Sequence, residues 1–243
     1  DVQMIVPNDF PDFLKWLPDN EKIICFDSEK ENVEQLITKA NILFFCDFND
    51  PKRLNGIEGF IDLDKNIKIM IDHHPQPVDF VDYMISDTSV SSTAELIFEF
   101  IHELEKKDFK DVNIAECLLT GIITDTGLFH HNAETNRTFE IVAELIKMGA
   151  DKGKIINKLY NEYPYSRMQL LGNTLHNRMK FYPEFGTSFI YLTKDDLIKY
   201  YYQNGDSEGF VNMALSIAGA KFSAIFIEKE DHIKASFRSI GDF

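Results

Sequence analysis

The sequence has few cysteines, a single tryptophan and no long hydrophobic run. Its three cysteines, Cys25, Cys46 and Cys117, are odd in number and lack the paired spacing of a zinc site, which favours reduced thiols over disulfides or structural zinc. No apolar stretch reaches the roughly 18–20 residues that a membrane-spanning helix needs, and no secretory signal pattern is visible. We therefore expect a cytoplasmic protein that does not bind membranes.

Positive charge is also scarce, because 25 Lys and Arg residues are outnumbered by 40 Asp and Glu residues, which gives a formal net charge of −15. Duplex DNA is bound largely through many Lys and Arg contacts to phosphates, so stable binding of a long duplex is not expected. A small anion can still bind where a local site supplies cations, and bound metal ions are one source of them. The composition thus favours a short anionic ligand.

The first part of the chain alternates strand-like and helix-like segments. Apolar runs without polar interruptions are typical of parallel strands that are covered on both faces, and intervening helices complete an α/β pattern. We therefore predict a parallel-sheet domain with helices on both faces over residues 1–150. The predicted strands are residues 2–6, 23–26, 42–46, 67–71 and 84–86.

The pattern changes in the second part of the chain. Residues 151–183 are predicted to form a helical linker, with helices at 152–160 and 166–179. Residues 184–243 alternate strand-like and helix-like segments and end in a predicted hairpin formed by 222–228 and 232–239. We expect a smaller mixed α/β domain here, with a cleft between it and the first domain.

Carboxylates and imidazoles recur just past the ends of apolar elements. Asp47 ends "ILFFCDFND", the triplet Asp72-His73-His74 ends "IKIMIDHH", and Asp125 follows "LLTGIIT". Ligand sites of open parallel sheets lie at the carboxyl ends of the strands, so these residues converge if the two strands are neighbours and if the helix before Asp125 packs over that edge. A single Asp at a strand end is more often a turn residue or a helix cap, but a D-H-H triplet is much rarer by chance.

Such a group of side chains suits a divalent ion such as Mn²⁺. Two ions bound side by side can stabilise the attacking and leaving oxygens of a phosphoryl group. His74 is expected on the opposite side of an extended backbone from His73, where it can contact the phosphate or transfer a proton.

These motifs, in this order, resemble the DHH phosphoesterase superfamily, whose name comes from the triplet seen here as Asp72-His73-His74. Within it, the sequence looks like the bacterial bifunctional oligoribonuclease/pAp phosphatases (nanoRNases) and the related cyclic-dinucleotide phosphodiesterases. The other matching segments are "CDFND", "SVSSTAEL" and "ITDTGLF", followed by "GDSEGFVN" and "KASFRSIG", which resemble the start of the associated DHHA1 domain. The resemblance covers nearly the whole chain.

The resemblance implies two Mn²⁺ ions, with Mg²⁺ as the alternative ion. By position in the motifs, Asp47 would bridge the two ions, and His73 and Asp125 would each bind one of them. Asp72 would orient the two histidines from behind the ligands. His74 would contact the scissile phosphate, so His74 and Asp72 are the predicted catalytic pair.

Substrate binding is implied for three residues, including His74. Arg238 in "SFRSIG" would reach a phosphate or base of the nucleotide from the second domain, because a guanidinium binds phosphate through two hydrogen bonds. His131 in "GLFHHN" would line the nucleotide pocket. Two family segments are absent from the sequence, an H-x-N-P-D-G-D-type metal motif and a G-G-G-H segment. We expect them before Asp1 and after Phe243.

The implied function is hydrolysis of short RNA or DNA oligonucleotides, dinucleotides and 3′-phosphoadenosine 5′-phosphate (pAp) to mononucleotides. A cyclic-di-AMP or pApA phosphodiesterase and a pyrophosphatase relative are alternative enzymes. A nucleotide-binding module without catalysis is an alternative of a different class. A processive exonuclease is disfavoured because the acidic composition offers no positive channel. A homodimer is compatible with the resemblance.

Overall fold

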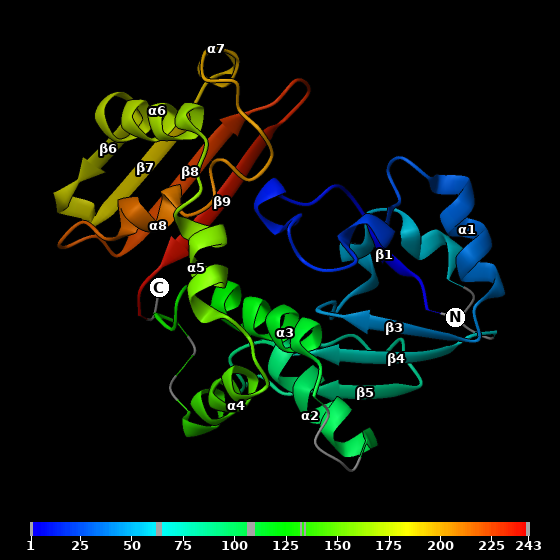
Figure 1. The fold of residues 1–243 in the computed structure, drawn as a ribbon. Coiled ribbons are helices and arrows are strands. Elements are labelled where there is room, and N and C mark those ends of the chain that lie inside the picture. The colour runs from blue at the N-terminus through cyan, green and yellow to red at the C-terminus, as the bar shows by residue number, and fades with distance from the viewer. Residues whose placement is uncertain (1, 62–64, 106–109, 132, 134, 242–243) are drawn as a thin grey trace. The chain divides into compact units, whose positions relative to one another are not determined.

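The chain, seen here in a computed structural model, forms two compact units, described at residues 2–61, 65–105, 110–131, 133 and 135–241 (Figure 1). The first unit comprises Asp1–Asp9 and Leu14–Leu159, and the second comprises Phe10–Phe13 and Tyr160–Phe243. Both units mix helices and strands, which confirms the predicted α/β class. The predicted linker, residues 151–183, contributes to both units.

The first unit contains parallel strands only, within the described residues. Strand β1 (Met4–Val6) pairs with β2 (Ile23–Cys25), and β3 (Ile42–Cys46), β4 (Ile67–Asp72) and β5 (Tyr83–Ser86) form a second sheet in that order. The register pairs Cys46 with Ile71 and Asp72 with Ser86. The carboxyl ends of β3, β4 and β5 therefore lie side by side, as Figure 1 shows.

Both faces of the β3–β5 sheet are covered. Successive side chains of a strand point to opposite faces, and the neighbours Met70 and Ile71 are exposed by only 0% and 2%. On one face, Met70 and Phe45 join a core with Val33 of helix α1 (Lys30–Lys39). On the other face, the ring of Phe44 contacts that of Phe100 in helix α2 (Thr93–Glu105), with ring centroids 6.0 Å apart.

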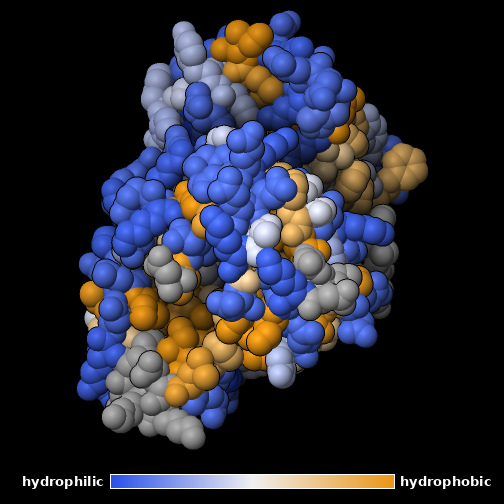
Figure 2. All heavy atoms as spheres, turned by 90° about the vertical axis from the view of Figure 1, so that its right-hand side faces the viewer, coloured by the Kyte–Doolittle hydropathy of each residue, from blue (hydrophilic) through white to orange (hydrophobic). Residues whose placement is uncertain are grey.

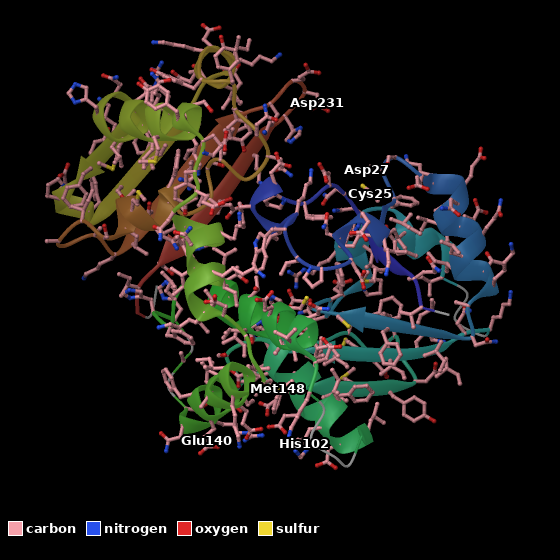
Figure 3. All side chains as sticks on the ribbon, viewed as in Figure 1. Cys25, Asp27, His102, Glu140, Met148 and Asp231 are labelled. Atoms are coloured by element: carbon pink, nitrogen blue, oxygen red, sulfur yellow. The ribbon has the colours of Figure 1, made fainter. Side chains whose placement is uncertain are left out.

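Among the described residues, three further α-helices of the first unit follow α2. They are α3 (Val112–Asp125), α4 (Asn136–Lys147) and α5 (Lys152–Tyr160), whose last residue is grouped with the second unit. The Asp111 carboxylate caps α3 by accepting hydrogen bonds from the backbone N–H groups of Asn113 and Ile114. Figure 3 marks α2 by His102 and α4 by Glu140. Within the described residues, no helix has both the length and the apolar character to cross a membrane.

The second unit is a mixed sheet with helices packed on one face. Strands β6 (Met179–Tyr182), β7 (Thr187–Leu192), β8 (Phe222–Glu228) and β9 (Ile233–Ser239) lie in that order, and only β7 and β8 are parallel. Figure 3 labels Asp231 at the tip of the β8–β9 hairpin. Helices α6 (Tyr165–Asn173), α7 (Lys194–Lys199) and α8 (Phe210–Leu215) complete the unit. Its core includes Leu170, Ile190, Leu192, Phe210 and Ile225.

Strand β6 corrects the sequence prediction of a helix through residue 179. The apolar spacing of Met168, Leu171 and Leu175 favours a helix, but α6 ends at Asn173 and a wide helical turn follows to Arg178. Arg178 Nε then lies 2.8 Å from a carboxylate oxygen of Asp196, and Met179–Tyr182 pair with β7. Tertiary contacts therefore override the local helical pattern, which is a common outcome for short elements.

Candidate metal centre

Asp47 and the triplet Asp72-His73-His74 lie at adjacent strand ends. The backbone N–H of Asp47 donates to the carbonyl of Ile71 at 3.0 Å, so the β3–β4 ladder continues up to the site. Asp47 itself has a φ of 68°, a left-handed conformation that Asp tolerates better than most residues. The chain therefore leaves the sheet directly at the predicted ligand, where strained backbone is often associated with function.

The two histidines lie close to Asp47 and Asp125. His73 Nε2 lies 3.0 Å from Asp125 Oδ2 and 3.8 Å from Asp47 Oδ1. His74 Nδ1 lies 3.7 Å from the same Asp47 oxygen. One ligand atom from each of Asp47, His73 and His74 falls within 4.8 Å of the others. The structure thus brings together Asp47, His73, His74 and Asp125, which come from three different elements.

Asp72 is fully buried and is hydrogen bonded to His74. One carboxylate oxygen accepts the His74 backbone N–H at 2.5 Å, and the other lies 3.2 Å from His74 Nδ1. The ring of His73 instead has its Nδ1 3.5 Å from the carbonyl oxygen of Val90. The contacts described for Asp72 therefore reach His74, whereas the resemblance implied that Asp72 orients both histidines.

The two imidazoles do not lie on opposite sides of the backbone as expected. Their ring centroids are 4.8 Å apart, and both rings face the Asp47 carboxylate. The expectation assumed extended backbone through the triplet, but β4 ends at Asp72 and the chain bends at His74. His74 consequently joins Asp47 and His73 in a group of side chains that could hold a metal ion.

Thr93, at the start of α2, is a site residue that the sequence reasoning missed. Its hydroxyl donates a hydrogen bond to Asp47 Oδ1 at 2.7 Å. The Glu95 N–H donates to Ser92 Oγ at 3.4 Å, as in a capping box, but the Glu95 carboxylate accepts from Ser91 and Thr138. The segment "SVSSTAEL" contained the signal, because it places a threonine beside a helix start.

The predicted substrate-binding residues His131 and Arg238 are exposed, and they belong to different units. His131 follows a turn in which Gly127, Leu128 and Phe129 all have positive φ, and its backbone N–H donates to the Thr126 carbonyl at 3.0 Å. Arg238 lies on β9, where its guanidinium donates to the carbonyl of Phe237 at 2.8 Å. No hydrogen bond or ion pair found among the described residues joins His131 to Asp47, Asp125 or the two histidines of the triplet.

The charge of His73 depends on its acidic neighbours. The hydrogen bond that the protonated His73 ring donates to the Asp125 carboxylate raises the pKa of His73 above its usual 6.5. Burial of the ring opposes this shift, and the negative charges of Asp125 and Asp47 add to it. In the metal-free protein, a protonated His73 lies between the two carboxylates and therefore stabilises the folded state.

This raised pKa predicts a pH-dependent stability of the metal-free protein. Because the His73 pKa is higher in the folded than in the unfolded chain, its contribution is fully present below about pH 6.5 and is lost as the pH rises through the folded pKa. Urea unfolding with a chelator should show a wild-type advantage over His73→Gln that shrinks from pH 6 to pH 8. An advantage that grows over this range would contradict the assignment.

The donor set fits a divalent metal ion. One carboxylate and two imidazoles within 4.8 Å, with a second carboxylate beside His73, are the ligands that Mn²⁺ and similar ions accept. Asp125 is the last residue of α3, where the helix dipole disfavours a negative charge unless a cation is near. The arrangement of this carboxylate is therefore better suited to a cation site than to a helix end alone.

A parallel α/β unit with a D-H-H triplet at the carboxyl end of an inner strand, next to an aspartate of the neighbouring strand, defines a distinct class of proteins. Residues 3–122 match the DHH family, N-terminal domain. The chain belongs to this DHH family.

Relatives match most of the chain. The bifunctional oligoribonuclease and PAP phosphatase NrnA of Bacillus subtilis is 27% identical over 91% of this chain and 69% of its own length. NrnA of Thermus thermophilus is 29% identical over 96% of this chain and 65% of its own length. A crystal structure of an exopolyphosphatase-related protein from Bacteroides fragilis is 41% identical, with a TM-score of 0.93 over 99% of this chain and 70% of the other. The chain thus spans about two thirds of the length of its curated relatives.

Proposed function

We propose that this protein hydrolyses phosphate esters of short nucleotides, with divalent metal ions bound at the Asp47–His73 cluster. The proposed substrates are short oligonucleotides, dinucleotides and pAp, and the proposed ions are two Mn²⁺, with Mg²⁺ as the alternative. The observation that carries the proposal is the convergence of Asp47, His73, His74 and Asp125 at one sheet edge. The names of the NrnA relatives support the substrate class.

Each residue of the cluster has a proposed task. Asp47, His73 and Asp125 hold the metal ions. The bound ions would neutralise phosphoryl oxygens and make water a better nucleophile at neutral pH. Asp72 fixes the ring of His74 through Nδ1, which leaves Nε2 as the ring nitrogen free to face the phosphate. His74 thereby orients the scissile group and is placed to move a proton.

The charge of the protein supports short substrates. The net charge of −15 opposes binding of a long polyanion, whereas a dinucleotide or pAp carries few phosphates. Figure 2 shows one face of the molecule as largely hydrophilic, with hydrophobic side chains gathered in its lower part. Arg238 and His131 are the proposed contacts to the nucleotide. The proposed location is the cytoplasm, which holds such nucleotides.

Replacing Arg238 by Ala is expected to weaken binding of a dinucleotide more than it slows small-ester cleavage. Loss of a charge-assisted hydrogen bond to phosphate should raise KM roughly tenfold to a hundredfold. Hydrolysis of bis-(p-nitrophenyl) phosphate should persist, because this ester lacks the distal nucleotide. Lys234→Ala is the matched control, since Lys234 is an exposed cation on the same face of β9. Equal losses on both esters would contradict a substrate-binding role for Arg238.

A substrate panel tests the proposal. Purified protein with Mn²⁺ would be assayed by chromatography against a linear dinucleotide, pAp, cyclic-di-AMP, pyrophosphate and a short polyphosphate. Release of nucleoside monophosphate from the dinucleotide, with phosphate release from pAp, is the expected result. Preference for the cyclic dinucleotide would favour the phosphodiesterase alternative. Nucleotide binding without turnover of any substrate would favour a binding module.

A further inference from the structure

Thr93 connects the start of α2 to the end of β3, across 46 positions of sequence. Its hydroxyl donates to Asp47 Oδ1 at 2.7 Å. The same oxygen faces His74 Nδ1 at 3.7 Å and His73 Nε2 at 3.8 Å. Thr93 therefore contacts the one carboxylate oxygen that both imidazoles share.

The position of Thr93 in its helix explains why the hydroxyl is available. Within α3, threonine hydroxyls donate to the carbonyl four residues earlier, as Thr120 does to Glu116 and Thr124 does to Thr120. Thr93 is the first residue of α2, so the residue four positions earlier precedes the helix. With 6% of Thr93 exposed, water competes little for the hydrogen bond.

Buried hydrogen bonds hold the start of α2 in place. Glu95 is 1% exposed, and its carboxylate accepts the Ser91 backbone N–H at 3.3 Å, the Ser91 hydroxyl, and the Thr138 hydroxyl of α4 at 2.9 Å. Ser91 and Thr138 are both fully buried. Because a buried acceptor is costly to leave without donors, this network ties the first turn of α2 to α4 and restrains Thr93.

We propose that Thr93 is a positioning residue that orients the Asp47 carboxylate for metal binding. The inference rests on the proposed function, because it takes Asp47 as a metal ligand. The side chain of Asp47 is 55% exposed. Contact with bulk water does not fix the orientation of its carboxylate, whereas the hydrogen bond from Thr93 does. A fixed hydroxyl donor selects one orientation of the carboxylate and leaves the remaining lone pairs for the ion. Mutation of a residue that hydrogen bonds to a metal ligand typically lowers metal affinity 10- to 100-fold.

Metal titration of Thr93 variants tests the proposal. Mn²⁺ binding to the full-length protein would be measured by calorimetry and by electron paramagnetic resonance of the bound ion, alongside kcat and KM for a dinucleotide. Thr93→Val keeps the shape but removes the hydroxyl, and should weaken Mn²⁺ binding roughly 10- to 100-fold. Thr93→Ser keeps the hydroxyl and should retain wild-type affinity. Thr120→Val removes a buried hydroxyl that bonds only within its own helix, and should leave Mn²⁺ affinity unchanged.

The outcomes separate the inference from the proposed function. Wild-type protein that binds no Mn²⁺ would overturn both. Wild-type binding with equal affinity in Thr93→Val would overturn the positioning role and leave the metal site standing. Thr93→Ser with the affinity of Thr93→Val would also overturn it, because the hydroxyl would then not be the cause. If thermal melts show that the valine variant is unfolded, Thr93→Ala replaces it with the same expected loss.

Discussion

Replacing Asp125 by Ala is expected to abolish Mn²⁺-dependent release of nucleoside monophosphate from a dinucleotide. The substitution removes the carboxylate that lies 3.0 Å from His73 Nε2, and with it one proposed metal ligand. Loss of a residue that only hydrogen bonds to a metal ligand lowers metal affinity or activity roughly 10- to 100-fold. Loss of a ligand itself should therefore reduce turnover by about 100-fold or more. Steady-state assays at saturating Mn²⁺ measure the effect.

The matched control for this variant lies at the other end of the same helix. Asp111→Ala removes the N-cap of α3 and should cost about 1 kcal/mol of stability without affecting Mn²⁺ binding. Comparison of the two variants separates loss of the site carboxylate from loss of helix stability. Turnover by Asp125→Ala above a few per cent of wild type would rule out Asp125 as a necessary ligand.

The clustering of the site could be predicted because it follows from local rules. Apolar runs that end in Asp47 and in Asp72-His73-His74 indicate parallel strands, and parallel strands place their carboxyl ends at one edge. Asp125 joins them because α3 ends at Asp125 beside His73. From the sequence alone, this is conditional on the helix before Asp125 packing over that edge. Whether these side chains perform the roles assigned to them stays a prediction.

The orientation of individual side chains could not be predicted in the same way. The rings of His73 and His74 share one neighbourhood because the backbone bends after Asp72, and no periodicity in the sequence indicates that bend. The Thr93–Asp47 hydrogen bond depends on how α2 packs beside β3. The Glu95 carboxylate accepts a hydrogen bond from Thr138 of α4, a buried donor 43 positions away that only the folded chain brings near.

Gly121 is a position where close packing between two helices should make an added methyl group destabilising. A Cβ atom added at Gly121, inside α3, would lie 2.9 Å from the Cβ of Ala94 in α2, closer than two such atoms approach in proteins. The two helices would have to separate, and they carry Asp125 and Thr93. Helix propensity alone would make Gly→Ala favourable by about 1 kcal/mol, so a net loss of stability reports the close helix contact.

We therefore expect Gly121→Ala to lower the free energy of unfolding by about 1–3 kcal/mol, the usual cost of overpacking, and to reduce dinucleotide turnover because Asp125 is displaced. Denaturant unfolding measures the stability. Gly172→Ala is the matched control, because Gly172 is helical and its added Cβ would meet no atom within 4 Å, so it should be neutral or stabilising. Adding Ala94→Gly to Gly121→Ala moves the methyl group to the other helix and should restore turnover. A Gly121→Ala protein more stable than wild type would show that α2 and α3 can separate without cost, and the contact would then not hold Asp125 in place.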